Sequence, residues 1–216
     1  MTENKEFIYL LNLRKTDFFK SLKKYKKEIF HHLHYLQDLK KSNLLIFAGT
    51  SLDEFYEIVV IKCKDRKQAE EISNNDPYVK LNILPVELFD FRASLLTDEI
   101  VDEIENPDEI DFSSFFKLPT NYYFGTITGR HTFISDITEE EDEIMGIHYQ
   151  YLKQRFDEKK LVFAGPILAH GTFGVNILKA ESFDEADQYM KQDPSVLSGI
   201  MKPGIHPFRI FFKGLK

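Results

Sequence analysis

The chain has 216 residues, enough for two small domains or one large one. Its hydrophobic fraction of 43% is ordinary for a globular protein with a buried core, and its net charge of −7 argues against nucleic acid as the main partner. The single cysteine, Cys63, excludes an internal disulfide and fits a reducing compartment. No apolar stretch approaches the roughly 18 residues that a membrane helix needs, and the polar start, residues 1–6, does not resemble a signal peptide. We therefore expect a cytoplasmic protein with neither a nucleic-acid nor a membrane partner.

The first half of the chain predicts six elements in the order β-α-β-β-α-β. In chain order they are strand 7–13, helix 17–41, strand 44–47, strand 56–63, helix 65–75 and strand 87–95. The strands are apolar or β-branched runs, and the long helix is rich in Lys and Leu without Gly or Pro. The second helix should stop at Asp76, because a following proline disfavours the helical conformation.

An acidic segment, residues 96–120, follows the first half. Residues 98–111 contain no basic side chain, and Asn106-Pro107 interrupts them. We interpret this segment as a solvated linker with one short amphipathic helix at residues 98–105.

The second half repeats the same order of elements. Its strands are predicted at 122–127, 161–167, 173–178 and 206–212. Its helices begin at two capping boxes, Thr138 with Glu141 and Ser182 with Glu185, in which a hydroxyl residue precedes Glu by three positions.

The two halves share a spaced set of residues. His32 precedes Ala48-Gly49 by sixteen positions, as His148 precedes Ala164-Gly165. Each half then reaches an Asp-Pro pair, and sixteen positions after each Asp comes an Arg preceded by Phe. These later residues are Asp76-Pro77 and Phe91-Arg92 in the first half, and Asp193-Pro194 and Phe208-Arg209 in the second. A repeat of this length indicates duplicated domains, which we place at 1–95 and 121–216.

The β-α-β-β-α-β order is that of a ferredoxin-like unit, with two helices on one face of a four-stranded sheet. One copy alone would expose the other, apolar face. We therefore predict an α+β fold in which two ferredoxin-like repeats form a dimeric α+β barrel within one chain, a covalent pseudo-dimer. The fold allows homo-oligomers of this pseudo-dimer.

Each repeat offers one histidine and one aspartate for chemistry. His32 and His148 fall on the inward stripe of the first helix of their repeat, where a histidine is usually a satisfied core residue. Recurrence in both repeats favours a functional role. Asp76 and Asp193 are either helix stops or carboxylates that fix the imidazole tautomer, making a general acid/base able to work near neutral pH.

Other repeated residues could bind a ligand. Tyr35 and Tyr151 share the helix face of the histidines; if they seal the pocket, a structural role is favoured instead. The repeated arginines are either surface residues or a clamp for a carboxylate or phosphate: Arg14, Arg130, Arg92 and Arg209. No nucleotide-binding loop and no metal-ligand spacing is present, so the sequence predicts neither an organic cofactor nor a metal site.

These residues resemble the YCII-related domain family. Its pattern is a histidine on the first helix, then Ala-Gly, usually followed by Pro, then Asp-Pro and an aromatic residue, then Pro-Phe near the last strand. The matches are His148, Ala164-Gly165-Pro166, Asp193-Pro194 and Pro207-Phe208 in the second repeat, and His32, Ala48-Gly49, Asp76-Pro77-Tyr78 and Phe91 in the first. The departures are Thr50 and Asp90, where proline is usual, and Ser195, where an aromatic is usual.

The resemblance implies the dimeric α+β barrel fold and a His–Asp pair in a pocket as the active site. One family member with a known reaction is a dehydrochlorinase of chlorinated-aromatic breakdown. Our leading hypothesis is a small-molecule enzyme of the lyase or isomerase type, with His148 as general acid/base oriented by Asp193. His32 and Asp76 would form a second site, so one, both or neither pair could be active. The alternative is a non-catalytic ligand-binding or regulatory module, in which the histidine is a polar anchor.

Overall fold

The structure is a computed structural model that describes residues 4–15, 18, 21–168 and 173–214. The chain divides into two compact units. Unit 1 comprises Met1–Asp90, Val101–Pro119 and Arg209–Lys216, and unit 2 comprises Phe91–Ile100 and Thr120–Phe208. Unit 1 therefore combines most of the first repeat with part of the linker and with residues 209–216 of the second repeat. Unit 2 combines most of the second repeat with residues 91–100.

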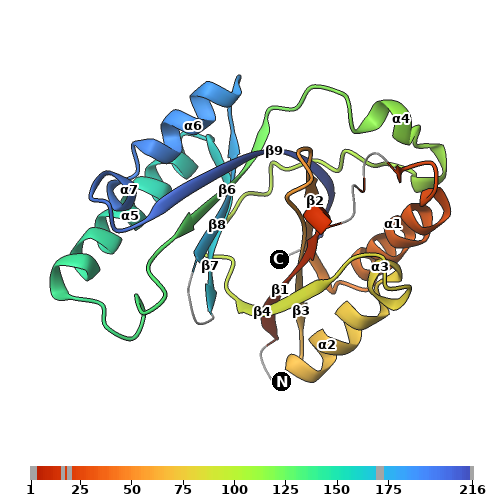
Figure 1. The fold of residues 1–216 in the computed structure, drawn as a ribbon, viewed down its shortest axis with the longest axis horizontal. Coiled ribbons are helices and arrows are strands. Elements are labelled where there is room, and N and C mark those ends of the chain that lie inside the picture. The colour runs from red at the N-terminus through yellow and green to blue at the C-terminus, as the bar shows by residue number, and fades with distance from the viewer. Residues whose placement is uncertain (1–3, 16–17, 19–20, 169–172, 215–216) are drawn as a thin grey trace. The chain divides into compact units, whose positions relative to one another are not determined.

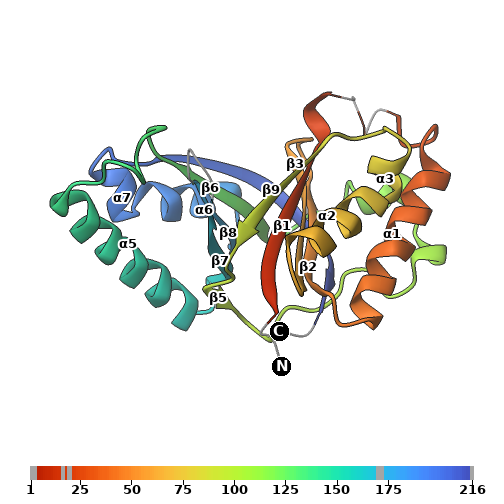
Figure 2. The same ribbon diagram turned by 90° about the horizontal axis from the view of Figure 1, so that it is seen from below.

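Unit 1 has the predicted β-α-β-β-α-β order with two additional short helical pieces, η1 and α3. Its elements are β1 (Lys5–Asn12), η1 (Leu13–Lys15), α1 (Lys26–Lys41), β2 (Leu45–Ser51), β3 (Tyr56–Cys63), α2 (Arg66–Asn75), α3 (Pro77–Lys80) and β4 (Val86–Phe91). The strand order is β4-β1-β3-β2, the ferredoxin-like order, and β3 is antiparallel to both β1 and β2. The helices lie on one face of these strands (Figures 1 and 2).

Unit 2 repeats this architecture. Its elements are β6 (Tyr122–Thr128), α5 (Glu139–Asp157), β7 (Leu161–Leu168), β8 (Phe173–Lys179), α6 (Phe183–Lys191), α7 (Pro194–Leu197) and β9 (Lys202–Lys213). The order β9-β6-β8-β7 matches that of unit 1, and α5, α6 and α7 cover one face of the strands (Figure 1). Both predicted capping hydroxyls are in use, since Thr138 and Ser182 accept from the N–H groups of Glu141 and Glu185.

The core of each unit lies between its helices and its sheet. In unit 1, Leu33 and Leu36 of α1 pack with Tyr9, Val59 and Ile61 of the strands, all fully or almost fully buried. In unit 2 a second cluster of buried residues gathers Tyr123, Leu161, Leu178, Ala186 and Met190. The same pattern of inward-facing positions therefore produces both halves of the fold.

Two segments of the chain add edge strands to the sheets. β5 (Leu95–Leu96) pairs antiparallel with β7 in unit 2. In unit 1 the last residues of β9 lie next to β2, and the N–H of Gly214 donates to the carbonyl of Ile46 at 3.0 Å. The predicted strand 87–95 thus ends at Phe91, and a separate short strand follows it.

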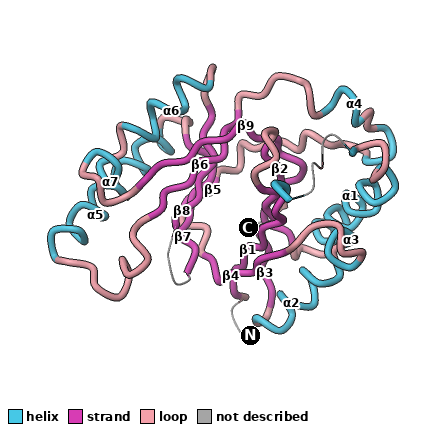
Figure 3. The backbone as a smooth tube through the Cα atoms, in the orientation of Figure 1, coloured by secondary structure: helices cyan, strands magenta, loops and turns pink. Residues whose placement is uncertain are grey.

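The acidic segment is neither solvated throughout nor helical where we expected a helix. Residues 98–105 form no helix (Figure 3), and the only helical pieces described between β5 and β6 are η3 (Pro107–Glu109) and α4 (Phe112–Phe115). The chain passes from unit 2 to unit 1 between Ile100 and Val101, and Ile100 and Ile104 are both buried. A helix would hold these isoleucines on one face, whereas the chain buries one in each unit.

Carboxylates of this segment also have partners within unit 1. Asp102 pairs with Lys40 and accepts from the N–H of Lys213 at 2.7 Å. Glu103 pairs with Arg209 at 2.6 Å. These contacts explain why acidic residues pack against the fold instead of extending into solvent.

Two further expectations differ from the structure. The first helix begins at Lys26, with residues 21–25 forming turns, while residues 16–17 and 19–20 lie outside the described residues. Asp76 ends α2 but also caps α3, because its side chain accepts from the N–H of Tyr78 and Pro77 is the first residue of the new helix. Among the described residues, no helix is both long enough and apolar enough to cross a membrane.

Candidate active site

His148 and Asp193 are in contact in unit 2. Nδ1 of His148, on α5, lies 2.9 and 2.8 Å from the two carboxylate oxygens of Asp193. Asp193 caps α7, and its Oδ1 also accepts from the N–H of Ser195 at 2.9 Å and from the Ser195 hydroxyl at 2.7 Å. Because an ionised carboxylate only accepts, the imidazole proton belongs on Nδ1, which leaves the lone pair of neutral His148 on Nε2.

A cavity of about 330 Å³ lies beside His148, entirely within unit 2. Most of its walls are apolar, and Arg92, Ser94, Tyr149 and Asn176 supply polar groups besides His148. Nε2 of His148 makes no hydrogen bond or ion pair to any described residue. The site therefore presents an unpaired imidazole nitrogen at a cavity of the size that small ligands occupy, roughly 300–1,000 Å³.

Part of the cavity wall comes from the segment that follows the first repeat. Arg92, Ser94 and Leu95 line it, and all three belong to unit 2. This segment is held by the pairing of Leu95 with Ala164 and by the stacking of Phe91 on Phe163, whose ring centroids are 5.6 Å apart. Gly165 is needed there, because a Cβ at this position would lie 2.1 Å from the carbonyl oxygen of Arg92.

The first repeat makes the same His–Asp contact but seals it. Nδ1 of His32 lies 2.9 Å from Oδ1 of Asp76, and the hydroxyl of Tyr9 donates to the other Asp76 oxygen at 3.0 Å. Nε2 of His32 forms an ion pair with Glu57, and the ring stacks on Tyr78 at 4.2 Å. His32 is 0% exposed, so both of its nitrogens are bound within the core.

This network fixes His32 in its charged form. Burial opposes the charge, but the carboxylates of Asp76 and Glu57 outweigh it and raise the pKa of His32 to about 10. Burial raises the pKa of Glu57, against the opposing effect of His32. Burial and the charge of Asp76 also raise the pKa of Tyr9 well above its ordinary value. The first repeat thus contains an imidazolium between two carboxylates.

Equivalent strand positions explain why one site is closed and the other open. Glu57 pairs with Leu11 of the first strand and with Thr50, the residue after Ala48-Gly49. Gly174 pairs in the same way with Ile127 of the first strand of unit 2 and with Pro166, the residue after Ala164-Gly165. The position that provides a carboxylate to His32 therefore has no side chain in unit 2, where Gly174 lines the cavity.

The aromatic residues of the closed site are also absent from the open one. The carboxylate of Asp76 accepts from the N–H of Tyr78, whereas that of Asp193 accepts from the N–H of the smaller Ser195. Val59 and Asn176 are equivalent, because they pair with Ala48 and Ala164 of the shared Ala-Gly motif. Tyr9 pairs with Val59, and Gly125 pairs with Asn176, so Tyr9 corresponds to Gly125. Smaller side chains at these positions leave His148 accessible from the cavity.

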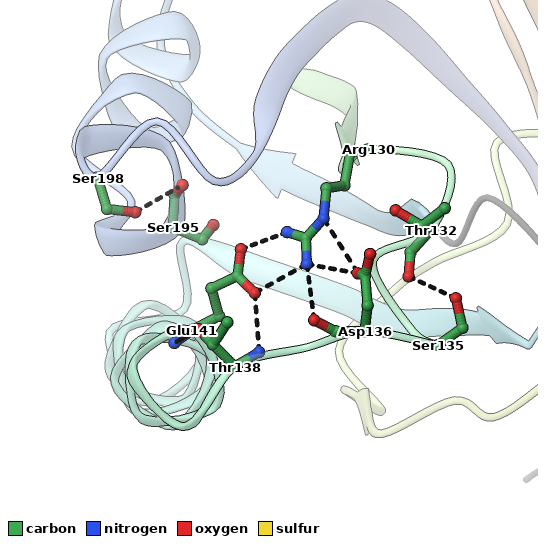
Figure 4. A network of polar contacts seen from close by, with 8 residues as sticks. All are labelled: Arg130, Thr132, Ser135, Asp136, Thr138, Glu141, Ser195 and Ser198. Carbon is green, nitrogen blue, oxygen red and sulfur yellow. Dashed lines mark hydrogen bonds and ion pairs between the residues drawn. The ribbon is translucent and has the colours of Figure 1, made fainter.

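The four arginines proposed as ligand-binding residues lie in different surroundings. Arg14 is exposed, donates to the Tyr56 hydroxyl at 2.7 Å and lies over the Phe55 ring. Arg130 is also exposed and binds the carboxylates of Asp136 and Glu141 at the start of α5 (Figure 4). Neither arginine lines the cavity.

Arg209 and Arg92 are equivalent positions with opposite environments. Arg209 is 4% exposed and donates to Glu103 and to the carbonyl of Leu118, both at 2.6 Å. Arg92 lines the cavity and has no ion pair or side-chain hydrogen bond to any described residue. Arg92 alone of the four is placed to meet a ligand in this cavity.

The two repeated tyrosines hold the helices of their units together. The Tyr35 hydroxyl donates to the carbonyl of Ile72 at 2.7 Å, and the Tyr151 hydroxyl donates to the carbonyl of Tyr189 at 2.9 Å. Neither tyrosine lines the cavity. The described residues contain no group of three or more His, Cys, Asp or Glu side chains placed to hold a metal ion.

Sequence reasoning did not identify Glu57, Gly174 or Asn176. Glu57 and Asn176 had a usable signal, because each is a polar residue within a predicted apolar strand. Asn176 is 3% exposed, lines the cavity and has a carboxamide oxygen without a hydrogen-bond partner. An unsatisfied buried acceptor of this kind is uncommon and often marks a functional site.

Comparison with solved structures shows the fold class. Two proteins named "putative monooxygenase" resemble nearly the whole chain. The one from Lactobacillus acidophilus NCFM has a TM-score of 0.54 at 11% identity, with 98% of this chain and 97% of that chain covered. The one from Fusobacterium nucleatum subsp. nucleatum has a TM-score of 0.55 at 11% identity, with 99% and 97% covered.

A mutant chlorite dismutase from Candidatus Nitrospira defluvii is similar at a TM-score of 0.55 and 9% identity, with 96% of this chain and 92% of that chain covered. At these identities the likeness shows the fold alone, which is that of the dimeric α+β barrel proteins, as predicted from the sequence. No curated protein sequence matches the chain.

The family model of the YCII-related domain matches the chain twice, over residues 12–92 and 125–208. The two matches fall on the two repeats and together cover well over half of the 216 residues. The chain therefore belongs to the YCII-related domain family, as a tandem duplication of the domain.

Proposed function

We propose that the protein is a small-molecule enzyme of the lyase or isomerase type, with its single active site in unit 2. The observation that carries this proposal is the open Nε2 of His148 at a cavity of about 330 Å³, beside a carboxylate that fixes the ring. His148 is the general acid/base, and Asp193 is its positioning residue.

The proton transfers follow from the tautomer. Neutral His148 donates Nδ1–H to Asp193 and presents its Nε2 lone pair to the cavity. Nε2 removes a proton from a carbon of the substrate, and the C–H electron pair remains on the substrate. Asp193 stabilises the imidazolium that results. Return of the proton to another atom gives isomerisation, and expulsion of a leaving group gives elimination.

The first repeat acts as a structural counterpart in this proposal. Glu57 occupies Nε2 of His32, and the ring is 0% exposed. A substrate could reach His32 only after the core around it opened. We therefore assign His32 and Asp76 to the stability of unit 1 and assign no catalytic step to them.

Hydrogen exchange in D2O tests this function with a panel of small carbonyl compounds. The protein is incubated with each compound, and loss of carbon-bound ¹H is followed by NMR. A general base should catalyse exchange of at least one compound, and His148→Gln should slow that exchange by about 100-fold or more.

His131→Gln is the matched control, because His131 is an exposed histidine of the same unit outside the cavity lining. This variant should catalyse exchange of the same compound at the wild-type rate. Equal exchange by wild type and His148→Gln would overturn the proposal. A panel compound with an acidic C–H that binds the cavity and is recovered without exchange or conversion would identify unit 2 as a non-catalytic binding module instead.

A further inference from the structure

The sealed site of unit 1 shows what the open site of unit 2 can hold. Glu57 and Gly174 are equivalent positions, and the Glu57 carboxylate forms an ion pair with Nε2 of His32. Both histidines are oriented in the same way by an aspartate that caps the following short helix. The space above Gly174 is therefore the counterpart of a space that an anion fills in the first repeat.

We propose that the cavity of unit 2 binds a small carboxylate or enolate, whose oxyanion lies against Nε2 of His148 where Glu57 lies against His32. The proposal rests on the proposed function in placing the ligand in this cavity, and it adds the chemical class of the ligand. The substrates it selects are carbonyl compounds with an apolar body and an acidic C–H, because loss of that proton produces an enolate oxygen.

The charges along the cavity support an anionic ligand. Arg92 lines it as a cation without a partner among the described residues, whereas the equivalent Arg209 is neutralised by Glu103. No acidic side chain is among the described residues that line the cavity. Asp193 directs both carboxylate oxygens at Nδ1, on the other side of the imidazole ring. An oxyanion at Nε2 would meet cations without facing a carboxylate.

Proton transfer in unit 2 produces the same pair of charges that unit 1 contains permanently. When Nε2 removes a proton from the substrate carbon, the site contains an imidazolium and an enolate, which together have the charges of His32 and Glu57. A ligand that is already a carboxylate reproduces this state once Nε2 is protonated, so its binding should take up a proton. The buried ion pair of unit 1 is thus an internal analogue of the charged state that unit 2 reaches during turnover.

Benzoate is the probe for this proposal, with benzamide as a neutral molecule of the same shape. Calorimetry at pH 8, where an ordinary imidazole is neutral, in two buffers of different ionisation enthalpy gives the affinity, the stoichiometry and the number of protons taken up. We expect one benzoate per chain with proton uptake, benzamide binding at least tenfold more weakly, and Arg92→Ala weakening benzoate about tenfold. Equal binding of the two probes, no binding of benzoate, or benzoate binding without proton uptake would overturn the proposal.

A substitution that closes the second site provides an independent measurement. Gly174→Glu should place a carboxylate against His148 and abolish benzoate binding. Gly146→Glu is its control, because it introduces the same carboxylate in unit 2 at an exposed glycine outside the cavity lining, where a Cβ meets nothing within 4 Å. It should leave benzoate affinity within about threefold of wild type. Unchanged benzoate affinity in a folded Gly174→Glu variant would refute the proposal, and the benzamide comparison needs no variant.

The two proposals fail separately. Benzoate binding with proton uptake, combined with no D2O exchange, would retain the oxyanion site and reject the enzyme. Exchange that depends on His148, combined with equal binding of benzoate and benzamide, would retain the enzyme and reject the oxyanion site.

Discussion

The same histidine-to-alanine substitution can be made in the sealed site of unit 1 and in the open site of unit 2. The difference in the free energy of unfolding between the two variants measures what the buried ion network contributes to stability. His32→Ala would leave Asp76 and Glu57 facing each other in a core where both are at most 2% exposed. Removing one partner of a buried ion pair costs about 3–5 kcal/mol, because the remaining charge has lost its compensation. His148→Ala leaves one carboxylate, Asp193, which keeps two hydrogen bonds from Ser195 beside a cavity. Its cost should be about 1–2 kcal/mol.

Urea unfolding at pH 7 followed by circular dichroism gives both values. The free energy of unfolding should fall about 2–3 kcal/mol further in His32→Ala than in His148→Ala. Glu57→Gln adds a check, because it keeps the side-chain shape while removing one of the two charges that face His32. A His148→Ala variant as unstable as His32→Ala would refute the reasoning, since it would show that the sealed network contributes nothing beyond the single His–Asp contact.

Three further predictions concern stability. The folded pKa of His32 is about 10 against an ordinary 6.5. The stabilisation that charged His32 provides is therefore complete below about pH 6.5 and is lost as the pH rises through 10. Between about pH 6 and 11, the free energy of unfolding should fall less in His32→Gln than in the wild type. Gly165→Ala should destabilise by about 1–3 kcal/mol through its backbone clash, whereas Gly146→Ala, with nothing within 4 Å, should stabilise by about 0.5–1 kcal/mol in thermal melts. Arg209→Ala should lower the free energy of unfolding in urea by about 2–4 kcal/mol, because it breaks a buried ion pair. Arg92→Ala should leave the free energy of unfolding nearly unchanged.

The elements with a strong local pattern were predictable from the sequence. β3 was expected at residues 56–63 and occupies Tyr56–Cys63, and α5 begins after the expected cap at Thr138. The four-residue helices α3 and α7 escaped prediction because Pro77 and Pro194 indicate a helix stop as readily as a first helical turn. The pairing of β5 with β7 depends on residues about seventy positions apart, which no local pattern encodes.

The contents of the candidate site were less predictable than the fold. Spacing alone related His32 to Asp76 and His148 to Asp193, and both contacts are present at hydrogen-bond distance. The difference between the repeats was hidden because Glu57 and Gly174 lie between the Ala-Gly and Asp-Pro motifs, where the spacing differs. Gly49 precedes Asp76 by 27 positions, whereas Gly165 precedes Asp193 by 28. Strand pairing was needed to show that they are equivalent. Whether the open pair performs chemistry stays a prediction.

The exchange of chain segments between the units has a consequence for protein synthesis. Residues 209–216 complete unit 1, although most of that unit is encoded at the start of the chain. A ribosome synthesises these residues long after most of unit 1, so the edge beside β2 stays unpaired until they have been made. We expect a nascent chain stalled before residue 209 to be cleaved by proteases within the first repeat, and the released chain to resist them.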